Sequence, residues 1–124
     1  MASTFSASDA YLRVASACPT VRVADVAHNL AQISALYTAA VTADVAVVVF
    51  PELCITGYSL GDLVQHASLL TQAQQAVQTL ATQTHTHHTV MVVGLPMVWG
   101  NAIYNVAAVL AEGRIVGIVP KQHL

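Results

Sequence analysis

The stretch VAVVVFPELCITGY, residues Val45–Tyr58, decides how this chain folds. Its first six residues are apolar and mostly β-branched, which is typical of a sheet strand that is covered on both faces. Pro51 ends the run because proline brings no N–H to a strand ladder, and Glu52 follows directly. A buried strand has no structural need for an acid at its exit, so Glu52 calls for a chemical explanation.

A second strand end is built in the same way. The segment Ile115–Lys121, IVGIVPK, is another apolar run that ends in a proline and then a charge, and that charge is the only lysine of the chain. Ligands commonly bind at the carboxyl ends of strands in α/β sheets. The sequence therefore predicts that Glu52 and Lys121 are parts of one site.

Hydrophobic periodicity predicts the remaining elements on both sides of Val45–Phe50. Loops are expected between Gly57 and Gly61 and over Pro96–Asn101, and a hairpin turn at Ala111–Gly113. The expected elements are a strand over Tyr11–Ala17, a helix that begins near the N-cap Asp25 and reaches Val41, a helix around Leu69–Leu80, and strands over Thr89–Gly94, Tyr104–Leu110 and Arg114–Val119. This order predicts an α/β fold with helices on a mixed sheet.

Composition limits the class of protein. The 124 residues are one domain's worth of sequence, with 56% apolar and only 8% charged residues, against about 25% charged in a typical soluble domain. Such a surface is expected when a chain is part of a larger protein. The apolar runs are too short to span a membrane, which takes about 20 residues, and no signal peptide is evident at the start of the chain. A cytoplasmic protein is therefore expected. The four scattered basic residues form no stripe for nucleic acid, so nucleic-acid binding is not expected.

Two interpretations stay open for each charged residue. Glu52 is either a general base or a structural carboxylate in a helix cap or surface ion pair. Lys121 either stabilises negative charge that develops on an oxygen or is a solvated surface lysine.

The other candidates are weaker. Cys54 lies close to Glu52 but has no basic neighbour in sequence, so packing is expected, as it is for Cys18. The cluster His85, His87 and His88 lacks metal-site spacing and predicts a polar loop. The segment Asn101–Asn105 is interpreted as loop and strand without chemistry of its own.

Four motifs together resemble the carbon-nitrogen hydrolase (nitrilase) superfamily: FPELCITGY, VVGLP, IYNVAAVL and GRIVGIVPKQHL, in this order. Within it, the start FSASDAYLRVASACPTVRVAD, the form PELCITGYSLGDL and the ending VPKQHL are most similar to the N-terminal glutaminase domain of bacterial glutamine-dependent NAD+ synthetases. The resemblance covers essentially the whole chain. It implies the N-terminal part of a nitrilase-like α-β-β-α sandwich, with residues 1–124 forming a partial hydrolase domain and the synthetase domain lying outside the chain.

The resemblance also implies roles for individual residues. Glu52 matches the general base of a Glu-Lys-Cys triad, Lys121 matches the lysine that stabilises the tetrahedral intermediate, and Tyr58 is expected near the glutamine pocket. The nucleophilic cysteine is expected beyond Leu124. No metal or cofactor is expected in this segment, whereas ATP and magnesium are expected in the synthetase domain.

The implied function is to hydrolyse glutamine and supply ammonia for the ATP-dependent amidation of deamido-NAD, in a protein that is a homo-oligomer at full length. These 124 residues alone are expected to be inactive. The alternatives are an amidase for another small amide, or a non-catalytic fragment.

Overall fold

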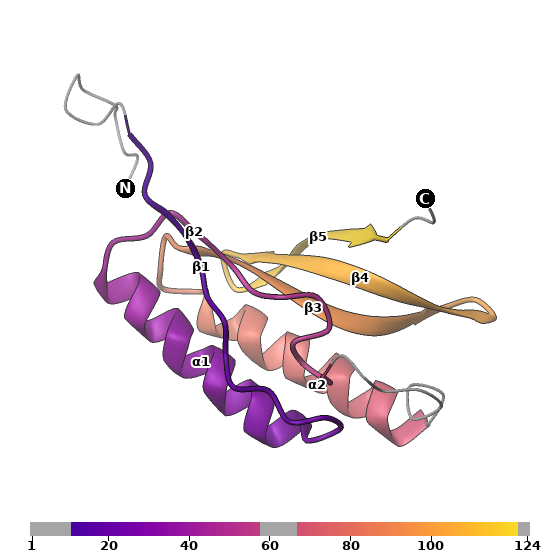
Figure 1. The fold of residues 1–124 in the computed structure, drawn as a ribbon. Coiled ribbons are helices and arrows are strands. Elements are labelled where there is room, and N and C mark those ends of the chain that lie inside the picture. Colours follow the sequence, from indigo (N-terminus) through magenta and orange to yellow (C-terminus); the bar gives the residue numbers. More distant parts are fainter. Residues whose placement is uncertain (1–10, 58–66, 122–124) are drawn as a thin grey trace.

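A computed structural model describes residues 11–57 and 67–121 of the chain (Figure 1). The elements follow one another as β1 (Val14–Ser16), α1 (Val26–Thr42), β2 (Val47–Val49), α2 (Ala67–Gln83), β3 (Val90–Trp99), β4 (Ala102–Ala111) and β5 (Arg114–Pro120). The predicted order of strands and helices is confirmed. Neither helix is long and apolar enough to cross a bilayer, as far as the described residues are concerned.

The sheet is mixed and its strands lie in sequence order, β1-β2-β3-β4-β5. The pairs β1–β2 and β2–β3 are parallel, whereas β3–β4 and β4–β5 are antiparallel. Strand β5 consequently runs in the same direction as β2 and β3, and the carboxyl ends of β2 and β5 lie at one edge of the sheet, whereas β3 continues past them to Trp99.

Both helices cover the same face of the sheet, as Figure 1 shows. Asp25 caps α1, because its side chain accepts a hydrogen bond from the His28 N–H at 3.1 Å, as the sequence predicted. The helices bury apolar side chains at steps of three and four residues against the strands. The largest fully buried apolar side chains of this core are Tyr37, Ile33, Ile55, Leu80, Met91, Leu95 and Leu110.

One expectation about the strands is wrong. Strand β3 runs through the expected loop over Pro96–Asn101 as far as Trp99, because its pairing with β4 continues to Trp99 and Ala102. Its pairing with β2 stops at Val92, so Pro96 does not have to supply an N–H to a ladder on that side. Among the described residues, one face of β2 is covered and the other is open, since Val48 is 1% and Val49 45% exposed.

Candidate active site

Glu52 stands in a tight turn that follows β2. The Cys54 N–H bonds to the Pro51 carbonyl at 3.2 Å, and the Gly57 N–H bonds to the Leu53 carbonyl at 2.7 Å. Leu53 has a φ of 53°, a left-handed conformation that is uncommon for a bulky residue and concentrates at functional sites. The chain therefore accepts local strain next to the carboxylate.

The turn passes over β3 at a glycine. A Cβ atom on Gly94 would lie 2.5 Å from the Leu53 nitrogen and 2.9 Å from the Pro51 carbonyl oxygen. The Ile55 N–H also bonds to the Gly94 carbonyl at 3.2 Å. Because Gly94 has no side chain, the turn lies directly against β3, and Glu52 reaches β4 and β5, two and three strands away in the sheet.

Lys121 meets Glu52 at this edge of the sheet. The Lys121 N–H continues the β4–β5 ladder by bonding to the Asn105 carbonyl at 2.8 Å, and the Lys121 Nζ lies 2.8 Å from the Glu52 Oε1. The structure thus brings together the two charged residues that the sequence placed in one site. Their catalytic roles stay predictions.

A third residue, Asn105 on β4, completes the cluster. Its Nδ2 donates a hydrogen bond to the same Glu52 Oε1 at 2.7 Å. The sequence interpretation of Asn101–Asn105 as segments without chemistry missed this contact. A signal was available, because Asn is depleted in strands and Asn105 interrupts the apolar run IYNVAAVL just as Glu52 follows one.

These three side chains lie in an open pocket of about 370 Å³. Its other lining residues are apolar or neutral and come from the ends of β2 and β5 and from the interior of β3 and β4: Val49, Phe50, Pro51, Val92, Val93, Gly94, Val106, Ala107, Val119 and Pro120. The Glu52 side chain is 33% and the Lys121 side chain 59% exposed. A carboxylate and an ammonium at the mouth of an apolar pocket can transfer a proton and stabilise a negative charge.

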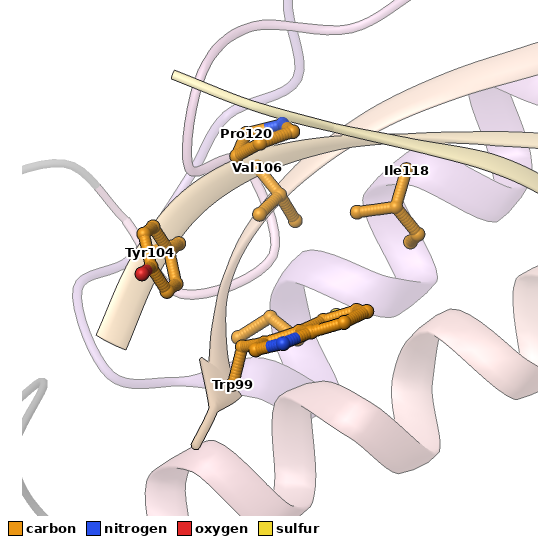
Figure 2. Close-up of a pocket in the computed structure, with 6 residues that line it drawn as sticks. Trp99, Tyr104, Val106, Ile118 and Pro120 are labelled. Carbon is orange, nitrogen blue, oxygen red and sulfur yellow. The ribbon is translucent and has the colours of Figure 1, made fainter. Parts of the chain in front are cut away.

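A second pocket, of about 350 Å³, lies on the opposite, helix-covered face of the sheet and shares the lining residues Val106 and Pro120 with the first. Figure 2 shows the Trp99 ring lying across from Val106 and Ile118, with Tyr104 to one side. Its side-chain lining is apolar except for the Tyr104 hydroxyl and the Trp99 indole N–H. Glu52 and Lys121 line the first pocket and not this one, so we place the chemistry in the first.

The remaining candidates differ in their positions. Cys54 is buried, and burial raises the pKa of its thiol to about 11, which agrees with the expected packing role. Cys18 is exposed. The three histidines follow the end of α2, and no group of three or more His, Cys, Asp or Glu side chains in residues 11–57 and 67–121 is placed to hold a metal ion. Tyr58 lies outside the described residues.

Residues 13–124 match the family described as carbon-nitrogen hydrolase. The glutamine-dependent NAD(+) synthetase of Mycobacterium tuberculosis is 35% identical over 114 residues, which are 92% of this chain and 17% of that relative. The chain thus spans less than a fifth of the length of this relative.

Solved structures agree with this similarity. A glutamine-dependent NAD(+) synthetase from Cytophaga hutchinsonii superimposes with a TM-score of 0.85 and 27% identity, over 91% of this chain and 19% of that one. An amidase from Nesterenkonia sp. superimposes with a TM-score of 0.76 and 21% identity, over 91% of this chain and 43% of that one. The likeness to the amidase shows the fold alone, and together the two confirm the nitrilase-like α/β fold.

Proposed function

Because the chain belongs to the carbon-nitrogen hydrolase family, we propose that it is part of the glutaminase portion of a glutamine-dependent NAD+ synthetase. In this proposal Glu52 is the general base and Lys121 stabilises the tetrahedral intermediate. The observation that carries it is the contact of 2.8 Å between Glu52 Oε1 and Lys121 Nζ at one edge of the sheet. An exposed ion pair adds at most about 1 kcal/mol to stability, so stability alone is a weak reason for this arrangement.

The proposed reaction needs a cysteine from the part of the protein beyond Leu124. Glu52 accepts the proton of that thiol, and the sulfur attacks the side-chain carbonyl carbon of glutamine. The carbonyl oxygen becomes negatively charged, and the Lys121 ammonium stabilises it. When the C–N bond breaks, the proton held by Glu52 passes to the leaving nitrogen and ammonia departs.

A thioester remains on the cysteine. Water attacks its carbonyl carbon, with Glu52 accepting a proton from the water and returning it to the sulfur, so that glutamate and the free thiol are regenerated. Glu52 therefore transfers protons in both halves of the reaction and forms no covalent bond to the substrate.

The wider role follows from the names of the relatives. We propose that the ammonia is used by a synthetase portion to amidate deamido-NAD with ATP and magnesium, in a cytoplasmic protein that is a homo-oligomer at full length. In support, a structure of a glutamine-dependent NAD+ synthetase from Acinetobacter baumannii, with a TM-score of 0.75 and 27% identity to this chain, is a complex with ADP.

The proposal is tested in the full-length protein by measuring ammonia release from glutamine. We expect Glu52→Gln and Lys121→Met each to lower kcat by at least about 100-fold, the scale of a lost general base or electrostatic stabiliser. Glu112→Gln is the matched control, because Glu112 lies in the β4–β5 turn and its carboxylate is 80% exposed. Full activity of Glu52→Gln would refute the assigned role. Turnover of a small amide such as acetamide, with none of glutamine, would instead establish the amidase alternative.

A further inference from the structure

The contact between Lys121 and Glu52 cannot by itself fix the carboxylate. The lysine side chain is a flexible four-carbon stem with a strongly hydrated head, and here it is 59% exposed. The Glu52 turn also contains a strained residue, Leu53. A general base is effective only when it stays within hydrogen-bonding reach of the proton that it takes. A more rigid group is needed to hold Glu52.

Asn105 has the required rigidity, because it lies inside β4, which is paired on both sides. On one side it is in register with Pro96 of β3, and on the other its carbonyl accepts the Lys121 N–H at 2.8 Å. Its short side chain then donates from Nδ2 to the Glu52 Oε1 at 2.7 Å. Asn105 thus bonds both to the backbone of Lys121 and to the side-chain carboxylate of Glu52, which are the two members of the ion pair.

The chemistry of the amide agrees with this orientation. An ionised carboxylate only accepts hydrogen bonds, so the amide nitrogen of Asn105, and not its oxygen, must face Glu52. The buried Asn29 is a useful contrast, because its side chain bonds to backbone groups of Arg22 and Ile55 and joins two segments of the fold. The Asn105 nitrogen bonds to the charged side chain itself.

We propose that Asn105 is a positioning residue that holds the Glu52 carboxylate beside Lys121 for proton transfer. This inference rests on the proposed glutaminase function. Because Asn105 donates to the charged form of Glu52, removing the donor disfavours ionisation of the carboxylate. Lys121 is the one other titratable or charged side chain among the described residues that line this pocket, and β3 and β4 present neutral groups to it.

The test uses Asn105→Leu and Asn105→Asp in the full-length protein, with glutamine as substrate. Leucine has a similar size but no donor, and aspartate keeps the shape while adding a like charge. We expect kcat to fall by about 10- to 100-fold, the effect of misplacing a catalytic group by about 1 Å, while KM stays within about twofold. The acidic limb of the pH profile should move to higher pH, further for Asn105→Asp than for Asn105→Leu.

Asn101→Leu and Asn101→Asp are the controls, because Asn101 is exposed in the β3–β4 turn; they should leave kcat and the pH profile unchanged. A wild-type pH profile and kcat in Asn105→Leu would overturn the proposal, as would a rise in KM alone. If the wild-type protein does not hydrolyse glutamine, the glutaminase assignment fails. Crystal structures of the wild type and of Asn105→Asp then still test whether Asn105 holds Glu52 in place. We expect Glu52 to leave Lys121 in the Asn105→Asp structure, and an unmoved Glu52 would overturn the positioning role.

Discussion

The absence of a side chain at Gly94 is expected to be essential for the placement of Glu52. In Gly94→Ala the new Cβ would lie 2.5 Å from the Leu53 nitrogen, about 0.9 Å short of the 3.4 Å at which ordinary van der Waals contact begins. The three nearest atoms, from Pro51, Glu52 and Leu53, all belong to the backbone of the turn, so no side chain can rotate away. The turn must move off β3 by about 1 Å and take Glu52 with it.

Two effects of Gly94→Ala follow. A shift of about 1 Å in a catalytic group costs about 100-fold in rate, so we expect kcat for glutamine to fall by about that factor. Overpacking of this kind also lowers the free energy of unfolding by about 1–3 kcal/mol. Activity is measured as ammonia release by the full-length protein, and stability as its melting temperature.

Gly117→Ala is the matched control, because it makes the same change on β5, where a Cβ atom would have its nearest contact at 4.0 Å from Val109. This variant should retain the wild-type kcat and melting temperature. If Gly94→Ala is as active as Gly117→Ala, the turn is not held by its contact with β3 and the steric reasoning is refuted.

Three further predictions concern reactivity, stability and completeness. Since burial raises the pKa of the Cys54 thiol to about 11, iodoacetamide at neutral pH should modify the exposed Cys18 and leave Cys54 unlabelled in native protein; rapid labelling of Cys54 would contradict this. Tyr37→Phe removes the bond of 2.7 Å from the Tyr37 hydroxyl to the Thr89 carbonyl and should cost about 1 kcal/mol of stability, seen as a lower melting temperature with an unchanged kcat. The isolated 124-residue chain should release no ammonia from glutamine, and measurable turnover would show that it holds a nucleophile of its own.

The element order could be predicted from the sequence because it depends on local patterns. Apolar steps of three and four residues predict both helices, and the β-branched run at Val45–Phe50 predicts β2. The β4–β5 turn was also predictable, because the connection is short and contains Gly113, which tolerates a positive φ. In the structure Glu112 and Gly113 both have positive φ, as a tight two-residue hairpin requires. The length of β3 could not be predicted in the same way. Pro96 ends a strand only where a neighbouring strand needs its N–H, and that depends on which strands pair with β3 at this position.

The site was predictable only in part, because its geometry depends on the sheet order. Glu52 and Lys121 stand out as charges that follow apolar runs, and strand-end chemistry suggests one site for both. Their contact, however, requires the turn after β2 to cross β3, which depends on Gly94 and on the order β2-β3-β4-β5. Asn105 stands out in the sequence as a polar residue within an apolar run, but its contact with Glu52 depends on the same sheet order, since the two residues are 53 positions apart.

The apolar character of β2 carries information beyond the residues that cover it here. Val48 faces the helices and is 1% exposed, whereas Val49 on the other face is 45% exposed and Val119 of β5 is 60% exposed. The sequence of β2 has the pattern expected of a strand that is buried on both faces, yet one of its faces is open among the described residues. This combination fits the second sheet layer that the nitrilase-like sandwich implies. Glu52, Asn105 and Lys121 lie at the edge of this face, so a second layer that packs on it would reduce the exposure of the site to solvent.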